Sequence, residues 1–231
     1  ESEGSGGSSN ESMEAVTVSG DVENGKNMEE DGCFKRGQQA PYIRFNNNCL
    51  YEMEDRDDGA HMFASDILSS LELPLSAPKI PDNMIIRPLR IDDYKRGYLQ
   101  LLSQLTFVGD VSEEQYRQRF LSMQSTRPKS YYIVVIEELS TRTLVGSATL
   151  VIEWKFIHEA GCRGRTEDVV VDKRMRGKQL GKLLNIYLVQ LARRIGVYKM
   201  SLECKDALIP FYGQVGFKVD EGNNFLVQRF A

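Results

Sequence analysis

The segment from Arg165 to Gly196 constrains the fold of this chain more than any other. It begins with an apolar, β-branched run, passes through a basic turn with two glycines, and continues as a long amphipathic helix pattern. Apolar residues recur at intervals of three and four along that helix, which we expect to end at Gly196. Because residues 197–204 (VYKMSLEC) form another strand pattern, the segment predicts a right-handed β-α-β unit.

The pattern before and after this unit predicts further strands and helices within one mixed sheet. Ser112, Glu114 and Gln115 have the arrangement of a capping box, and Asp92 or Asp93 is placed to cap the helix before it. By hydrophobic spacing and turn residues, we expect helices at 62–73, 94–105, 112–125 and 210–216, and strands at 84–90, 131–138, 144–154, 165–171, 197–204 and 217–230.

The first 61 residues differ in charge from the rest of the chain. They hold fourteen acidic and five basic residues, whereas residues 62–231 hold nineteen acidic and twenty-four basic ones. The segment is also rich in Ser, Gly, Glu and Asn, so it cannot bury enough apolar surface to offset the entropy lost on ordering. We predict an acidic, largely disordered tail over 1–61 and one folded domain over 62–231, with a partner-binding role for the tail left open.

Composition disfavours several other classes of protein. No apolar run approaches 18 residues and no signal peptide is visible, so we expect no transmembrane helix. The four cysteines are far apart, which favours reduced thiols in a cytoplasmic protein, with contact to a membrane surface left open. Two histidines do not favour a zinc site. The small positive charge of residues 62–231 does not favour nucleic-acid binding.

The basic turn Arg176–Gly181 reads RGKQLG and lies between the expected strand and helix. It matches neither the GxGxxG dinucleotide motif nor the GK[ST] ending of a nucleoside-triphosphate loop. Free amides at a helix start, with Arg176 and Lys178 beside them, favour an anion such as a pyrophosphate. A plain strand-to-helix turn with a solvated basic face explains the same letters, and the turn alone does not decide between the two.

Several separated motifs occur in the order found in one enzyme family. The valine strand, the R-G-x-x-L-G turn, the amphipathic helix, the next strand and the Phe211-Tyr212 pair resemble the GCN5-related N-acetyltransferases. Within that family, KFIHEAGCRGRTEDVVV, VYKMSLEC and FYGQVGF most resemble members that acetylate glucosamine 6-phosphate for UDP-N-acetylglucosamine synthesis. The resemblance covers about residues 62–231 and implies an α/β fold with a mixed, mostly antiparallel central sheet flanked by helices.

The resemblance implies acetyl-CoA as co-substrate, no metal, and direct attack of the amine in a ternary complex. The Val169 amide would polarise the thioester carbonyl, and the Tyr212 hydroxyl would protonate the leaving thiolate. The main-chain carbonyl of Glu203 would orient the attacking amine. The implied cofactor-binding residues are Val169, Val170, Val171, Arg176, Gly177, Lys178, Gln179, Leu180, Gly181 and Tyr212.

By the same resemblance, Glu167 and Asp168 would contact the amino sugar, and one of them, or a water it orients, would accept the amine proton. Adjacent strand residues point to opposite faces, so the two acids share a role only if the strand is distorted. The implied substrate-binding residues are Thr106, Lys155, Phe156, Ile157, His158, Glu167, Asp168, Val169, Tyr198, Lys199 and Arg229.

The cations of this set would face the sugar phosphate, although Lys199 and Arg229 also fit ordinary surface charge, and His158 fits a histidine packed beside Trp154. The last strand would cross to a partner subunit in a homodimer, so that Arg229 serves its own site or that of the partner.

One position departs from the family pattern. Leu208 stands where an asparagine usually contacts the cofactor, and leucine supplies no amide hydrogen bond; a typical hydrogen bond contributes about 1 kcal/mol. Leu208 supports one alternative, a coenzyme A-binding regulatory protein that has lost activity. The sequence also leaves open an acetyltransferase of this fold acting on another amine.

Overall fold

The computed structural model describes residues 60–230, so the predicted tail over 1–61 lies outside the described residues except for Ala60 and His61. A five-stranded sheet with the order β1-β2-β3-β4-β5 forms its centre. Neighbouring strands are antiparallel except β4 and β5, which are parallel. The expected mixed, mostly antiparallel sheet is thus confirmed. Its strands are β1 (Met84–Pro88), β2 (Tyr131–Glu138), β3 (Thr143–Trp154), β4 (Cys162–Val171) and β5 (Lys199–Ser201).

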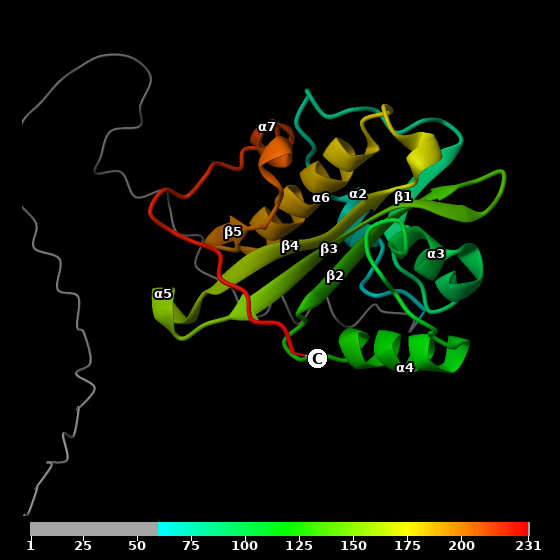
Figure 1. Ribbon diagram of the computed structural model, residues 1–231, viewed down its shortest axis with the longest axis horizontal. Helices are drawn as coiled ribbons and strands as arrows, with labels where there is room; N and C mark the ends of the chain where they lie inside the picture. Colours follow the sequence, from blue (N-terminus) through cyan, green and yellow to red (C-terminus); the bar gives the residue numbers. More distant parts are fainter. Residues whose placement is uncertain (1–59, 231) are drawn as a thin grey trace, which may run out of the picture. The chain divides into compact units, whose positions relative to one another are not determined.

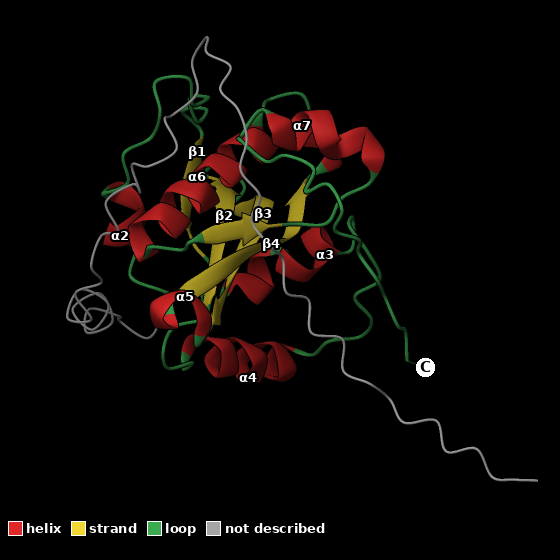
Figure 2. Ribbon diagram, turned by 90° about the vertical axis from the view of Figure 1, so that its left-hand side faces the viewer, coloured by secondary structure: helices red, strands yellow, loops and turns green. Residues whose placement is uncertain are grey.

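Helices cover both faces of the sheet (Figures 1 and 2). The longest helix, α6 (Leu180–Ile195), lies on one face beside α2, whereas α3 and α4 lie on the other. No helix within residues 60–230 is long and apolar enough to cross a membrane. The remaining helices are α2 (Asp66–Ser69), α3 (Tyr98–Leu102), α4 (Glu113–Gln124), α5 (Ile157–Ala160) and α7 (Ile209–Gly213), with 3₁₀ turns η1 (Asp93–Arg96), η2 (Lys173–Met175) and η3 (Asp206–Leu208).

Helix α6 is the crossover between β4 and β5, as the sequence predicts. Its apolar stripe is buried, and Leu184 packs so closely on β3 that a Cβ added at Gly146 would lie 3.3 Å from its Cδ1. A fully buried leucine of this kind costs about 2–5 kcal/mol when cut to alanine. The helix ends at Gly196, which has a φ of 83° and donates its amide to the carbonyls of Ala192 and Arg193. The glycine stop is confirmed.

The helix expected over 94–105 is broken, and this expectation was wrong in detail. Gly97 takes a φ of 80°, a left-handed conformation that ends η1 before α3 begins. Neither Asp92 nor Asp93 caps the helix with its side chain. Asp93 is instead fully buried, where it accepts two hydrogen bonds of 2.8 Å from the guanidinium of Arg87. By contrast, the capping box of α4 at Ser112 and Gln115 is confirmed.

The last strand is absent from the described residues. Residues 217–230 form no strand. They contain one turn, in which the Asn223 amide donates to the Asp220 carbonyl. A strand requires a neighbour for its backbone groups, and no other strand among residues 60–230 pairs with this segment. Phe225, Leu226 and Phe230 are 64%, 88% and 85% exposed. The expected strand at 197–204 is also shorter, and the helix expected at 62–73 spans only α2.

Candidate active site

The strands β4 and β5 part from each other halfway along β4. They pair only from Arg163 to Arg165, opposite Lys199 to Ser201, and β5 then ends. Beyond Arg165, no strand among the described residues pairs with that edge of β4. The backbone groups that point to this unpaired edge from Glu167 onward are therefore free to bind a ligand. The open stretch contains Val169, Val170 and Val171.

A β-bulge interrupts β4 at the two acidic residues. Glu167 pairs with Thr149 and Val170 pairs with Ser147, so β4 has one residue more than β3 over this step. Asp168 takes a φ of 51°, a left-handed conformation that is uncommon for a residue other than glycine. The bulge is the distortion that lets Glu167 and Asp168 depart from simple alternation. Strained backbone of this kind clusters at functional sites.

Arg165 binds the two glutamates that border the opening. Its Nε donates to the Glu167 carboxylate at 2.9 Å, and its Nη2 donates to the carboxylate of Glu203. The sequence predicts that Glu203 lies in a strand, but in the structure it follows β5 by two residues. Hydrogen bonds to Glu167 and then Glu203 raise the pKa of Arg165. Sequence reasoning missed Arg165, although the spacing R-x-E within a strand places the two side chains on one face.

Asp168 has a different environment from that of Glu167. No described residue gives its carboxylate a hydrogen bond or an ion pair, and surrounding protein atoms raise its pKa by desolvation. Its residue surface is nonetheless open to solvent. The result is an accessible carboxylate that is more basic than an ordinary aspartate, next to the Glu167 carboxylate, which accepts a hydrogen bond from Arg165.

The turn Arg176–Gly181 leads directly into α6. Gly177 has a φ of 83°, and a Cβ built there would meet nothing within 4 Å, so the turn is open to an approaching ligand. The N-cap residue Gln179 is left-handed as well, and no side chain caps the helix. The first amides of this 16-residue helix thus have no side-chain cap, and the exposed side chains of Arg176 and Lys178 lie just before them in the chain. This geometry favours an anion.

Tyr212 lies in α7 on the far side of this opening. The residue is 9% exposed, and its ring makes edge contacts with Phe211 at 4.9 Å and Phe217 at 6.1 Å. Burial and then the neighbouring Cys204 raise the pKa of its hydroxyl, so it stays protonated at neutral pH. Helix α7 is anchored against the turn because Phe211 packs on Gly181, where an added Cβ would lie 3.3 Å from the phenyl ring.

The cations expected to hold the sugar phosphate lie at the opposite end of β4. Lys199 pairs with Arg163, five residues before Asp168, which corresponds to about 16 Å along a strand. Its Nζ binds Asp220 at 3.4 Å, and the Nζ of Lys155 binds Glu153 at 2.7 Å. The structure of a single chain therefore does not bring these lysines to the bulge.

The loop carrying Lys155 and His158 has an unusual backbone. His158, Glu159 and Ala160 all have φ values between 53° and 57°, which costs roughly 1–2 kcal/mol for each residue. The ring of His158 lies 4.1 Å from that of Tyr198, measured between ring centroids. Its packing partner is therefore Tyr198, whereas the sequence suggested Trp154. On the same loop Phe156 is fully exposed and Ile157 is 63% exposed.

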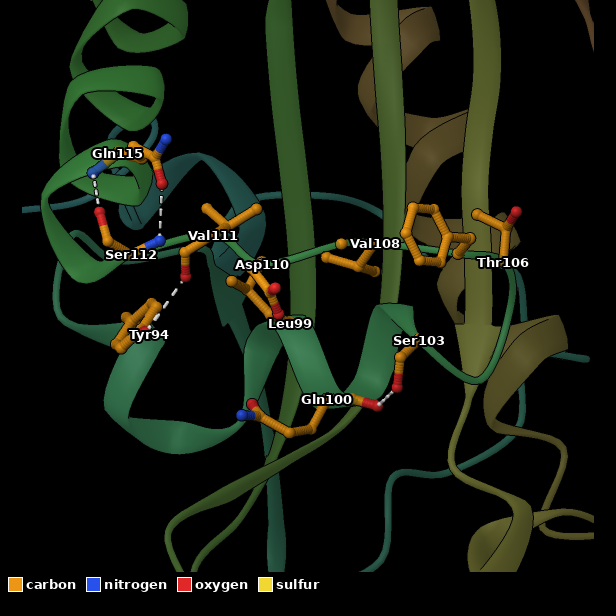
Figure 3. Close-up of a pocket in the computed structure, with 12 residues that line it drawn as sticks. Tyr94, Leu99, Gln100, Ser103, Thr106, Val108, Asp110, Val111, Ser112 and Gln115 are labelled. Carbon is orange, nitrogen blue, oxygen red and sulfur yellow. Dashed lines mark hydrogen bonds between the residues drawn. The ribbon is translucent and has the colours of Figure 1, made fainter.

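Thr106 and Arg229 both lie outside the helices and strands. Thr106 is exposed in the segment between α3 and α4, where it borders a cavity of about 760 Å³ (Figure 3). The lining of that cavity contains Asp110 and no lysine, arginine or histidine, so it does not suit a phosphate. Arg229 lies in the exposed segment that forms no strand. Leu208, the departure from the family pattern, is 44% exposed in η3.

The parting of β4 and β5 beside an uncapped, basic helix start defines the class of this protein as an N-acetyltransferase fold. More particularly, the sequence profile of the Acetyltransferase (GNAT) family matches residues 96–217, and the chain belongs to this family. The family resemblance drawn from the sequence is thus confirmed.

Relatives and solved structures agree with this assignment. A probable glucosamine 6-phosphate N-acetyltransferase of Drosophila melanogaster is 50% identical over 141 residues, which are 61% of this chain and 64% of that protein. The Arabidopsis thaliana glucosamine 6-phosphate N-acetyltransferase is 39% identical over 57% of this chain and 87% of that protein.

The crystal structure of an Arabidopsis thaliana glucosamine-6-phosphate N-acetyltransferase matches with 34% identity and a TM-score of 0.60, covering 64% of this chain and 99% of that one. A Trypanosoma brucei acetyltransferase matches with 32% identity and a TM-score of 0.57, covering 63% and 99% of the two chains. Within residues 60–230, no group of three or more His, Cys, Asp or Glu side chains is placed to hold a metal ion.

Proposed function

We propose that this protein transfers the acetyl group of acetyl-CoA to the amine of D-glucosamine 6-phosphate, giving the N-acetylated sugar phosphate and coenzyme A. The observation that carries the proposal is the bulge at Asp168, which places an unpaired carboxylate on the open edge of β4. The names of the relatives at 39–50% identity support the amino-sugar phosphate as substrate.

The cofactor would lie along β4 and end on α6. The amides of Gly177, Lys178 and the first residues of α6 would receive the pyrophosphate, because they point outward and lack a side-chain cap. Unpaired backbone groups of Val169–Val171 would bind the pantetheine arm. The thioester would then stop at the bulge, where the Val169 amide is placed to donate to its carbonyl oxygen as negative charge develops.

The chemical step needs no covalent intermediate on the protein. The neutral amine attacks the thioester carbon, a C–N bond forms, and the C–S bond breaks as coenzyme A leaves. We assign the amine proton to Asp168, since its pKa is raised and its carboxylate has no partner among the described residues, whereas Arg165 binds the Glu167 carboxylate. Tyr212 donates its proton to the leaving thiolate, a role that suits a hydroxyl kept protonated by burial.

A homodimer would complete the substrate site. Lys199, which is expected to bind the phosphate, lies about 16 Å from Asp168 along β4, and this distance favours its action in the site of a second subunit. The exposed apolar side chains of Phe156 and of residues 225–230 give such a subunit a surface to cover. We propose that residues 217–230, which have no strand partner among residues 60–230, pair with the partner subunit and bring Arg229 there.

Release of coenzyme A in the presence of candidate amines tests the proposed function. The full chain should release coenzyme A with glucosamine 6-phosphate and at least about 100-fold more slowly with glucosamine, because the cations need a phosphate. Equal rates with both sugars would exclude the phosphate-specific site. Turnover of a different amine only would favour another acetyltransferase of this fold, and no turnover with any amine would favour the regulatory alternative.

A further inference from the structure

Gln104 joins two parts of the chain that the proposed function uses separately. It follows α3, and its side chain reaches across to the residues after β4. Its Nε2 donates to Oδ2 of Asp172 at 3.3 Å, and its Oε1 accepts a hydrogen bond from the Lys173 amide at 2.9 Å. One half-buried amide side chain thus bonds both a carboxylate and a backbone group 68 and 69 residues away.

The far side of this bridge is the beginning of the cofactor turn. Asp172 is 6% exposed and caps η2, which leads into Arg176–Gly181. Its carboxylate also accepts hydrogen bonds from the Arg174 backbone and guanidinium, which lower its pKa to about 2. Asp172 is therefore an ionised acceptor at any physiological pH, held in place by partners other than Gln104.

The near side of the bridge is the segment that carries Thr106. Residues 105–107 are exposed, and Phe107, which is 91% exposed, lines the cavity shown in Figure 3. The backbone amides of Leu105 and Thr106 both donate locally, to the Leu102 carbonyl. Gln104 is thus positioned to transmit the arrangement of the η2 turn to Thr106, two residues further along the chain.

We propose that Gln104 is a positioning residue that couples the acetyl-CoA turn to the amino-sugar loop, so that binding of one substrate favours binding of the other. The inference rests on the proposed function, which places acetyl-CoA on Arg176–Gly181, and on the family resemblance, which implies that Thr106 contacts the amino sugar. When the pyrophosphate orders the turn, Asp172 and Lys173 become fixed, and the entropy cost of ordering residues 105–107 falls. Such a coupling is reciprocal between the two ligands.

Calorimetric titration of the full chain with coenzyme A, alone and with saturating glucosamine 6-phosphate, measures the coupling without turnover, since coenzyme A carries no acetyl group. The sugar should tighten coenzyme A binding to the parent by about fivefold or more. In Gln104→Leu this ratio should fall to about one, while the affinity for coenzyme A alone changes by less than about threefold.

Two further variants separate coupling from a general structural effect. Gln118→Leu removes an amide that also donates to a carboxylate, that of Glu114 at 2.9 Å, but on the exposed face of α4, so it should keep the parental ratio. The double substitution Gln104→Glu with Asp172→Asn preserves net charge and reverses the donor and acceptor, so it should restore most of the ratio that Gln104→Glu alone loses.

Retention of the parental ratio in folded Gln104→Leu would overturn the proposal, as would failure of the double substitution to exceed Gln104→Glu. Should Gln104→Leu not fold, the comparison between Gln104→Glu and the double substitution decides the question. A parent that acetylates glucosamine 6-phosphate but shows a ratio of one would overturn the coupling and leave the proposed function standing. A parent with no turnover would instead overturn the proposed function.

Discussion

Arg165 donates a hydrogen bond from its Nη2 to the carboxylate of Glu203, which joins β4 to the chain beyond β5 at the point where the two strands part. The same guanidinium binds Glu167. A single guanidinium therefore links two of the three carboxylates that border the opening. The third, on Asp168, is left without a partner among the described residues.

Replacing Arg165 by leucine should lower kcat by about 10- to 100-fold. Removal of hydrogen bonds to charged partners costs roughly 1.5–3 kcal/mol each, and the freed glutamates would repel each other and shift the amine. Steady-state kinetics and a thermal melt measure the two effects. Arg163→Gln is the matched control, since Arg163 lies on the same face but binds the Ser201 hydroxyl at 3.3 Å and Glu153 at 3.8 Å, and neither Glu167 nor Glu203, so it should retain nearly full activity.

Asp168→Asn should lower kcat by about 10²–10⁴-fold, the usual contribution of a general base. The parent should lose activity as pH falls through the raised pKa of Asp168, at a pH above the ordinary aspartate value of about 3.9. Glu167→Gln should mainly raise KM for the sugar. If Asp168→Asn retained parental kcat across the pH range, water alone would serve as proton acceptor.

Asp168→Asn should also slightly raise the free energy of unfolding at neutral pH. A carboxyl whose pKa is raised in the folded state binds its proton more tightly there than in the unfolded chain, so its ionised form opposes folding at pH 7. The parent and Asp168→Asn should converge in Tm below about pH 3.9, where the group is protonated in both states. Thermal melts at pH 7 and at the lowest pH that both proteins tolerate would show whether the two Tm values converge.

Tyr212→Phe should lower kcat by about 100-fold without a large change in Tm. The phenyl ring keeps the edge contacts with Phe211 and Phe217, so only the hydroxyl is lost. Because the pKa of Tyr212 is raised, any loss of parental activity at alkaline pH should begin above about 10. Unchanged turnover in the variant would assign protonation of the thiolate to solvent.

Gly177→Ala should raise KM for acetyl-CoA by about 5- to 10-fold, because a left-handed conformation costs a non-glycine residue roughly 1–2 kcal/mol. Gly213→Ala is the control. It also has open space around its Cβ position but ordinary helical φ in α7, so alanine should be neutral or stabilise by about 0.5–1 kcal/mol. Equal effects at both positions would contradict the role of the turn.

The β-α-β unit and the glycine stop at Gly196 could be predicted from sequence because their causes are local. A 3.6-residue apolar period requires a helix with one buried face, and a left-handed stop requires glycine. The capping box at Ser112 is similarly local, since its reciprocal bonds span three residues. Motif order then indicated the family, and with it the turn, the valine strand and Tyr212.

Relations between distant segments were decided only by the tertiary structure. The sequence suggested that Asp93 caps a helix. In the structure its carboxylate instead pairs with the buried guanidinium of Arg87, because a buried charge without a partner is strongly destabilising. The bulge at Asp168 follows from the register of β3 on β4, which no short pattern encodes. Arg165 and Gln104 have their partners 38 and 68 residues away, so their roles follow from the way the strands part and α3 packs, not from their neighbours in sequence.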